Sequence, residues 1–331
     1  MLSLITTATY LIFMKVTDYF EAAQDRTLIS FEVLPPMKGG SMQSIFNTLD
    51  PLMEFKPPFI DVTYHREEFI YRRRESGYYE KTAIRKRPGT VGICAAIMHR
   101  YGVDAVPHLI CGGFSKEETE NALIDLNFLN VNNVLVLRGD AAKFEHAFVP
   151  HPQGHAYALD LVKQVADINK GKYLDPSITK GDATNFCIGI AGYPEKHFES
   201  PNLETDMDFA KQKIQAGADY IVTQMFFNNQ KYLDYVKNCR AVGVDVPIVP
   251  GLKPITKKAQ LVGIPRLFFI DFPDDFVKEV LKAKDDDAVR EIGIEWCIMQ
   301  SKELKAAGVP CLHYYTMGDV KTIKRIAEAV Y

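Results

Sequence analysis

The chain has 331 residues, of which 47% are hydrophobic and 24% charged, and its formal net charge is −3. This length suits one barrel of eight strand–helix units, and the composition is that of a globular protein with a substantial core. The small negative charge gives no reason to expect nucleic acid or a membrane surface as a partner.

The first fourteen residues form an apolar segment that is too short to span a bilayer and lacks both a basic start and a small-residue cleavage site. Met14 is followed by a polar sequence that is typical of an N-terminus. We therefore expect translation to begin at Met14. We assign residues 1–14 to an N-terminal extension and residues 15–331 to a single domain.

Eight short apolar runs predict strands along the rest of the chain. Most are nearly continuous apolar runs, which is typical of parallel strands covered on both faces. The predicted strands are residues 28–34, 59–64, 105–111, 133–137, 186–191, 220–226, 247–249 and 311–316. Longer amphipathic segments between them predict helices, most clearly at residues 115–129, 203–216, 228–242 and 286–307.

Residues at the helix boundaries support these assignments. Ser115 and Glu118 have the spacing of a capping box, and Gly217, Gly243 and Gly308 follow predicted helices as C-terminal glycines commonly do. Strand and helix alternate eight times without a break. This order predicts an α/β fold, a single-domain (β/α)8 TIM barrel, and a doubly wound open sheet is the alternative.

Three further segments carry weaker expectations. The basic stretches at residues 72–74 and 85–87 are interleaved with Glu and Tyr, and we interpret them as a solvated helical face. Residues 141–154 and the segment after Gly251 are long predicted loops that follow strands, so both are candidate ligand loops. The six cysteines have no CxxC spacing, which favours buried thiols in a reducing, cytoplasmic compartment.

Polar residues lie at the predicted carboxyl ends of six strands, where barrels bind their ligands. Glu32 is an acid inside an apolar strand. Burial should raise its pKa, and we interpret it as a catalytic acid rather than as half of a structural ion pair. Arg138 can bind phosphate through two hydrogen bonds, and Gly139 lets the backbone approach a ligand. Gln224 offers a donor and an acceptor to a heterocyclic amide.

Other strand-end residues are ambiguous when taken singly, because a buried His, Tyr or Phe is more often structural than functional. His108, Tyr193 and Phe226 are of this kind. The sequence has no clustered metal-ligand motif and no Gly-rich nucleotide motif. We therefore expect no metal, and any dinucleotide would be held by the barrel itself.

Seven segments in chain order resemble the methylenetetrahydrofolate reductase family. They are Ser-Phe-Glu-Val-Leu-Pro-Pro at 30–36, Asp-Val-Thr-Tyr at 61–64, Pro-His-Leu-Ile-Cys at 107–111, Val-Leu-Arg-Gly-Asp at 136–140, Ala-Gly-Tyr-Pro-Glu-Lys-His at 191–197, Ala-Gly-Ala-Asp-Tyr-Ile-Val-Thr-Gln-Met-Phe-Phe at 216–227 and Val-Pro-Gly-Leu-Lys-Pro-Ile at 249–255. The lack of a second domain resembles the short bacterial enzymes, which have the catalytic barrel only.

The resemblance implies an enzyme that reduces 5,10-methylenetetrahydrofolate to 5-methyltetrahydrofolate for methionine synthesis. It implies bound FAD, NADH or NADPH as the electron donor, and ping-pong hydride transfer through flavin N5. The implied catalytic residues are Glu32, which protonates the folate, and Asp140, which lies near flavin and pterin. The resemblance also implies a homo-oligomer that binds the folate and a nicotinamide nucleotide.

The binding positions follow from the same motifs. The implied flavin site comprises Thr63, Tyr64, His108, Leu137, Arg138, Gly139, Asp140, Ala158, Tyr193, His197, Asp206 and Lys213, of which Thr63 is also expected to contact the nicotinamide nucleotide. The implied folate site comprises Asp140, Gln224, Phe226, Gln260 and Tyr315.

Three departures from the family pattern concern binding. The family usually has Arg where this chain has Asp319, and we expect an acid there to repel the carboxylate of the folate tail, with Lys257 or Lys258 as the compensating cation. Arg66 replaces a smaller family residue and would reach the flavin pyrophosphate or point to solvent. Residues 141–143 replace the usual prolines.

Two other functions remain open on the sequence. One is a barrel enzyme without flavin that acts on a pterin or a sugar phosphate, although no strand-end Lys suits a Schiff base. The other is a non-catalytic folate or flavin binder, against which Glu32 and Gln224 argue together. The choice between NADH and NADPH also stays open, since the sequence has no recognisable ribose-reading residue.

Overall fold

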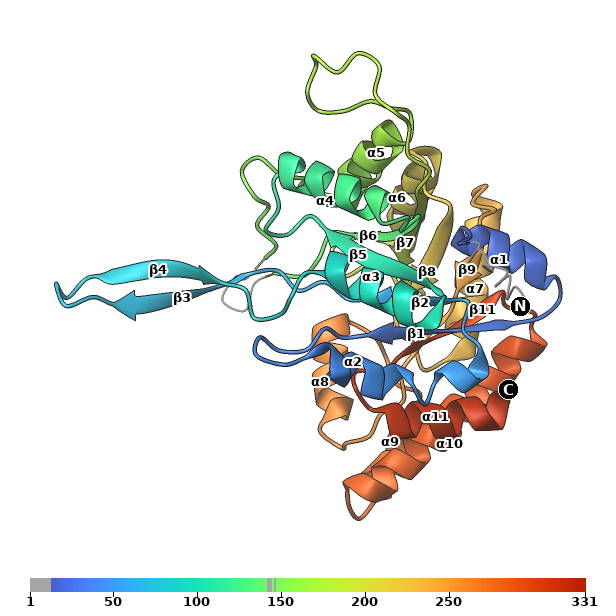
Figure 1. Ribbon diagram of the computed structural model, residues 1–331. Coiled ribbons are helices and arrows are strands. Elements are labelled where there is room, and N and C mark those ends of the chain that lie inside the picture. Colours follow the sequence, from blue (N-terminus) through green and yellow to red (C-terminus); the bar gives the residue numbers. More distant parts are fainter. Residues whose placement is uncertain (1–12, 142–144, 146) are drawn as a thin grey trace, which may run out of the picture.

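The computed structural model describes residues 13–141, 145 and 147–331, in which a ring of parallel strands is surrounded by helices (Figure 1). The strands are β1 (Leu28–Val33), β2 (Phe59–Val62), β5 (Asp104–Ile110), β6 (Asn133–Leu137), β7 (Cys187–Gly192), β8 (Tyr220–Thr223), β9 (Ile248–Val249), β10 (Gly251–Leu252) and β11 (Cys311–Tyr315). Each predicted strand is present. Most of their ends lie within two residues of the prediction, whereas β8 ends at Thr223 and not at residue 226.

The ring closes through a strand in two pieces. The order is β10-β11-β1-β2-β5-β6-β7-β8-β9, with β9 paired to β8 and β10 paired to β11. Only Pro250 separates β9 from β10, and its missing N–H interrupts the ladder. The two pieces therefore occupy one position in the ring. The fold is the predicted α/β TIM barrel.

Helices cover the outside of the ring, as parallel strands require. They are α1 (Val16–Ala23), α2 (Met42–Leu49), η1 (Met53–Phe55), α3 (Thr90–Tyr101), α4 (Lys116–Phe128), α5 (Ala158–Ile168), α6 (Leu203–Gln215), α7 (Asn229–Ala241), α8 (Gln260–Phe268), α9 (Asp274–Lys282), α10 (Asp286–Ala306) and α11 (Val320–Val330). The capping box at α4 is confirmed: Glu118 N donates to Ser115 Oγ at 3.2 Å, and Ser115 N donates to Glu118 Oε2 at 2.8 Å.

Two predictions about local structure were wrong. The basic stretch after β2 is no helix but an antiparallel hairpin of β3 (Glu68–Arg73) and β4 (Tyr79–Ile84). Its alternating aromatic residues and its Ser76–Gly77 turn, with Gly77 at φ 85°, favour a hairpin over a helix. The predicted loop after Gly251 contains α8, which includes Pro265; one missing N–H near the end of a helix does not unfold it.

Helix α1 closes the amino end of the barrel. Phe20 packs edge-on against Phe59 and Tyr220, with ring centroids 6.1 and 6.3 Å apart. Beneath this plug, Asp104 accepts hydrogen bonds from Met14 N at 2.9 Å and from the Tyr19 hydroxyl at 2.6 Å. The proposed translation start at Met14 concerns residues 1–12, which lie outside the described residues. The plugged end leaves the opposite end of the barrel to bind ligands.

Candidate functional site

The candidate site lies at the carboxyl ends of the barrel strands. Because the strands are parallel, these ends form a single rim, and alternation along each strand sends every second side chain inward. The structure accordingly brings Glu32 on β1 together with Thr63 after β2 and His108 on β5. These three come from sequence positions far apart, and the parallel pairing of β1, β2 and β5 brings them together.

Glu32 is the acid at the centre of this group. Its side chain is 13% exposed, and its Oε2 lies 3.6 Å from Nε2 of His108, which is 3% exposed. Burial raises the pKa of Glu32; His108 and the Thr63 hydroxyl oppose the rise, and Asp61 adds to it. Burial lowers the pKa of His108. The arrangement therefore favours a protonated carboxyl beside a neutral imidazole.

A second polar layer lies one step deeper in the barrel and was missed by sequence reasoning. Asp61 Oδ1 lies 3.7 Å from His108 Nε2, and Asp61 Oδ2 lies 3.8 Å from His313 Nδ1. Ser30 Oγ and His313 Nδ1 are hydrogen bonded at 2.8 Å. Both Asp61 oxygens, together with one ring nitrogen on each histidine, are buried without a hydrogen-bond partner. Polar residues spaced by two along apolar strands were the available signal.

This layer predicts an unusual pH dependence of stability. Burial raises the pKa of Asp61 from 3.8 to about 6, so the folded state holds this proton more tightly than the unfolded state does. The stability that the Asp61 proton gives to the folded state is fully present below pH 3.8 and is lost as the pH rises through 6. Asp61→Asn, which mimics the protonated acid, should match the wild type near pH 4 and exceed its unfolding free energy by at most about 3 kcal/mol near pH 7.

Urea unfolding at several pH values measures this difference. Asp25→Asn, at an exposed acid, is the matched control and should leave the curve unchanged. If the unfolding free energies of Asp61→Asn and the wild type changed with pH in parallel, Asp61 would ionise in the folded protein without loss of stability.

A second polar group lies where β6 and β7 end. The Arg138 guanidinium forms two hydrogen bonds with the Glu199 carboxylate, which holds the pKa of Glu199 below its ordinary value. Asp206 accepts a hydrogen bond from Ser200 Oγ at 2.8 Å and another from His197 N at 3.1 Å. Arg138 therefore has the two-pronged geometry expected for an anion, but a carboxylate of this chain occupies it.

The other predicted flavin positions surround that pair. The rings of Tyr193 and His197 meet edge-on at 4.7 Å, and the Lys213 ammonium lies 3.5 Å from the Ala191 carbonyl oxygen. Burial lowers the pKa of Lys213, and Asp206 opposes this effect. Aromatic faces beside two cations match the two ends of a flavin dinucleotide, a ring system and a pyrophosphate.

Small residues on the same rim leave room for such a group. Gly139 has φ 82°, which residues with a side chain rarely adopt, and a Cβ on it would lie 3.3 Å from Ile110. Both facts favour glycine here, and a glycine leaves its backbone open to a ligand. Ala158 is the first residue of α5, where free N–H groups favour phosphate. Leu137 ends β6, Tyr64 packs on Phe114, and Asp140 is exposed. These residues fit FAD.

Of the predicted folate positions, the structure separates Phe226 from the others. Gln224 and Gln260 are half-buried, and each carbonyl binds nearby backbone N–H groups: Met225 N at 2.9 Å for Gln224, Thr256 N at 2.7 Å for Gln260. The Tyr315 hydroxyl donates to Thr223 O at 2.6 Å. Phe226 is not part of this group, because its ring is 1% exposed and stacks on Tyr232 outside the barrel.

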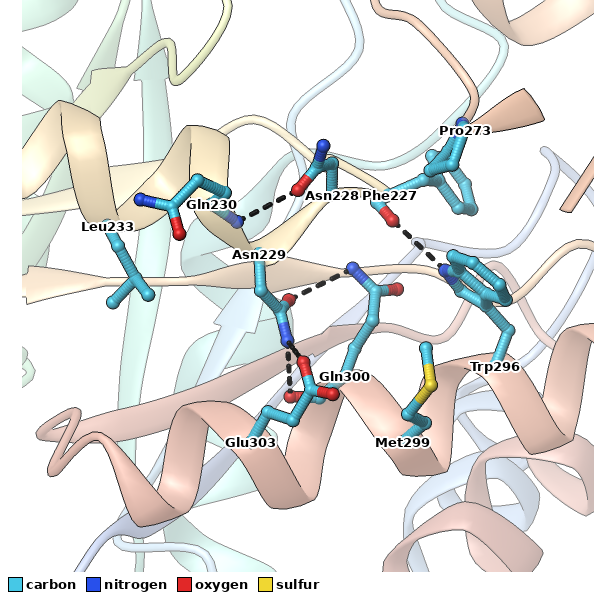
Figure 2. A pocket seen from close by; sticks show the side chains of 10 residues that line it. All are labelled: Phe227, Asn228, Asn229, Gln230, Leu233, Pro273, Trp296, Met299, Gln300 and Glu303. Atoms are coloured by element: carbon cyan, nitrogen blue, oxygen red, sulfur yellow. Dashed lines mark hydrogen bonds between the residues drawn. The ribbon is translucent and has the colours of Figure 1, made fainter. Parts of the chain in front are cut away.

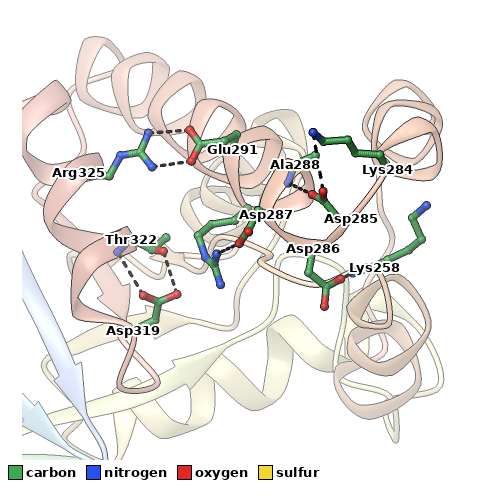
Figure 3. A network of polar contacts seen from close by, with 11 residues as sticks. Lys258, Lys284, Asp285, Asp286, Asp287, Ala288, Glu291, Asp319, Thr322 and Arg325 are labelled. Carbon is green, nitrogen blue, oxygen red and sulfur yellow. Dashed lines mark hydrogen bonds and ion pairs between the residues drawn. The ribbon is translucent and has the colours of Figure 1, made fainter.

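The residues that depart from the family pattern have local partners. Asp319 caps α11 and accepts hydrogen bonds from Thr322 N and Thr322 Oγ1 (Figure 3). Lys258 Nζ donates to the carbonyls of Leu281 and Ala283. Arg66 does not point to solvent: its side chain is 12% exposed, and Nη2 lies 2.5 Å from Glu145 Oε2.

Lys253, a half-buried cation near Asp319, was not singled out from the sequence. Lys253 follows β10, which is paired with β11, so it lies near the rim. Burial lowers the pKa of Lys253, and Asp319 opposes this effect. Within the described part of the chain, no three His, Cys, Asp or Glu side chains are arranged to hold a metal ion. No helix among the described residues could cross a membrane.

Comparison with known proteins identifies relatives along the whole barrel. The family model described as Methylenetetrahydrofolate reductase matches residues 16–331. Methylenetetrahydrofolate reductase 1 of Schizosaccharomyces pombe is 31% identical over 92% of this chain and 46% of its own length. The 5,10-methylenetetrahydrofolate reductase of Pectobacterium carotovorum is 30% identical over 89% of this chain and 87% of its own.

The coverage separates two kinds of relative. The chain spans about half the length of the eukaryotic relatives it matches and 87% of the short bacterial ones. A solved protein from Clostridium thermocellum, described as binding two copies of 5-methyl-5,6,7,8-tetrahydrofolic acid, has a TM-score of 0.57 and 13% identity, covering 95% of this chain and 98% of its own. At that identity the likeness concerns the fold alone.

Proposed function

The chain belongs to the methylenetetrahydrofolate reductase family, and from this premise we propose that it reduces 5,10-methylenetetrahydrofolate to 5-methyltetrahydrofolate. Electrons come from NADH or NADPH and pass through bound FAD in a ping-pong cycle. The product supplies methyl groups for methionine synthesis, and the reaction is cytoplasmic. The short bacterial relatives, which this chain covers almost fully, support an activity that needs no second domain.

Glu32 carries this proposal. Reduction of the methylene bridge needs a proton on the folate so that its five-membered ring opens, and a carboxyl with a raised pKa can supply it. Burial raises the pKa of Glu32, and the neighbouring His108 is held neutral by the same burial. Glu32 therefore acts as the general acid at the rim of the barrel.

The remaining rim residues hold the two ligands. Arg138, which now binds Glu199, and Lys213 would hold the FAD pyrophosphate, while Tyr193 and the backbone at Gly139 would position the rings. When bound, FAD supplies hydride transfer between the nicotinamide and the folate. Asp140 lies on the same rim and faces both ligands in this proposal.

Gln224 and Gln260 bind the folate. The amide nitrogen of each side chain can donate a hydrogen bond to an acceptor on the edge of a pterin. Each carbonyl now accepts from local backbone N–H groups, so the amide nitrogen is the group that is presented to a ligand. Thr63, next to Glu32, contacts the nicotinamide nucleotide. Relatives named for NADH and for NADPH both match this chain, so either nucleotide is compatible.

Colour provides the direct test. Purified protein should be yellow, should bleach when NADH or NADPH is added without oxygen, and should regain its colour when 5,10-methylenetetrahydrofolate follows. A colourless protein that takes up no FAD would refute the proposal. Bleaching without recovery on adding the folate would identify a flavin reductase with another electron acceptor.

A further inference from the structure

A two-stranded arm projects from the barrel beside the candidate site. The arm comprises residues 67–87 and contains β3 and β4, which pair along their full lengths from Glu68–Ile84 to Arg73–Tyr79. It extends to the left of the barrel in Figure 1, well beyond the helices. At about 3.3 Å per residue, strands of six residues reach roughly 20 Å from the barrel.

One face of the arm is aromatic and cationic. Alternation places Phe69, Tyr71 and Arg73 of β3 on the same face as Tyr79 and Lys81 of β4. The aromatic residues are 40%, 64% and 67% exposed for Phe69, Tyr71 and Tyr79, and Tyr78 at the turn is 79% exposed. Lys81 Nζ lies 3.9 Å above the Phe69 ring. Tyr and Arg are the residues that protein interfaces favour.

This arm lacks support of its own. Among the described strands, β3 and β4 pair only with each other, so both outer edges have open backbone groups. An isolated two-stranded sheet is marginally stable in water, and open edges with exposed aromatic residues readily pair with another chain. The arm therefore has the properties of a segment that is covered in the working protein.

The same chain carries a surface of opposite charge. The arm contains seven Lys and Arg against four Glu, whereas residues 271–287 contain seven Asp and Glu against three Lys. We call residues 271–287 the acidic edge; it includes α9 and the start of α10, and Asp285, Asp286 and Asp287 are seen in Figure 3. The Asp275 and Asp287 side chains are 89% and 90% exposed.

A groove with a partly apolar lining adjoins the acidic edge. Its volume is about 360 Å³. Pro273, which precedes α9, lines it together with Leu233, Trp296 and Met299, and Figure 2 shows these side chains around the opening. Trp296 is fixed there by a 3.0 Å hydrogen bond to Phe227 O, and Met299 is 41% exposed. Most of the rest of the lining is polar and includes Glu303. A groove with an apolar wall and acidic residues at its edge complements an aromatic, cationic face.

We propose that the arm docks on the acidic edge and groove of a second copy of this chain. Tyr78 and Tyr79 enter the groove beside Pro273, while Arg73 and Lys81 face Asp274 and Asp275. The occupant is a second copy because the chain itself supplies both complementary surfaces.

The arm cannot reach the groove of its own chain. In Figure 1 it leaves the barrel on the left, whereas α7, α9 and α10, which carry the groove and the acidic edge, lie at the right and the bottom. The contact must therefore form between copies. Two copies that exchange arms reciprocally make a closed dimer, and one-way docking makes a ring.

Charge reversal on each surface tests the proposal. Sedimentation velocity over a range of protein concentrations should show the wild-type chain as a dimer or larger. Arg73→Glu with Lys81→Glu should weaken self-association at least tenfold, and so should Asp274→Lys with Asp275→Lys. All four residues are on the surface, so the far-UV circular dichroism spectrum should show an unchanged fold.

Combining the four substitutions in one chain provides the decisive measurement. Both surfaces are then reversed, complementarity returns, and self-association should recover. The matched control exchanges a cross-strand pair on the opposite face, Arg72→Glu with Glu80→Arg, which leaves the net charge of the arm unaltered. This control should associate like the wild type.

Three outcomes would overturn the proposal. The first is a wild-type chain that is monomeric at every concentration. The second is self-association that neither pair of reversals weakens, or that the four-residue variant fails to regain. The third is a monomer whose arm binds a labelled single-stranded oligonucleotide, since the cationic face would then recognise nucleic acid. None of these outcomes depends on the reaction proposed above.

Discussion

Glu32→Gln should slow the folate half-reaction about a thousandfold while it changes flavin reduction by the nicotinamide only a few-fold. General acids contribute roughly a hundredfold to ten-thousandfold, and Gln keeps the size of Glu but has no proton to give. Anaerobic stopped-flow absorbance measures the two half-reactions separately. In the wild type the folate half-reaction should also slow as the pH rises through the raised pKa of Glu32, and the variant should lose this dependence.

Glu120→Gln is the matched control. Glu120 lies on α4, outside the candidate site, and is a buried acid, 7% exposed. It accepts a hydrogen bond from Leu174 N at 2.8 Å. Both half-reactions should keep their rates in this variant. If Glu32→Gln slowed the two half-reactions equally, Glu32 would hold the site together and would not transfer the proton.

Gly251→Ala should lower the free energy of unfolding by about 4 kcal/mol, since overpacking and a broken buried hydrogen bond act together. A Cβ on Gly251 would lie 2.2 Å from Thr223 O and 2.5 Å from the Tyr315 hydroxyl. These two atoms share a 2.6 Å hydrogen bond. The Thr223 carbonyl has no room to move within the ring, so Tyr315 and Gln224, which follows Thr223, must shift. Urea unfolding gives the stability, and folate affinity should fall with it.

Gly263→Ala is the control for this change. Gly263 lies within α8, and a Cβ on it would meet nothing within 4 Å. Ala favours a helix over Gly by roughly 0.5–1 kcal/mol, so this variant should be as stable as the wild type or slightly more. A Gly251→Ala protein of wild-type stability would mean that β10 relaxes away from β8 without cost.

The barrel was predictable because its signal is local. Nearly continuous apolar runs such as those of β6 and β7, set between amphipathic helices, indicate parallel strands wherever they occur. Where the prediction failed, a second local pattern competed with the first. Residues 68–84 combine charges that suggest a helix face with aromatic alternation that suggests a hairpin, and the hairpin pattern prevailed.

The site was only partly predictable. Strand-end position alone selected Glu32, which the structure places beside His108, and Gln224, which is half-buried directly after β8. It also selected Phe226, because the predicted strand was extended to residue 226. The strand ends at Thr223, so inward alternation does not continue to Phe226.

The amino-acid sequence by itself determined the order of strands and helices and the family, because periodicity, capping and motifs act over short stretches of chain. Tertiary structure alone decided which distant residues meet: Asp61 with His108 and His313, Arg138 with Glu199, and a hairpin arm directed away from its own acidic edge. Those contacts depend on how eight strands register as the ring closes, and no single segment contains that information.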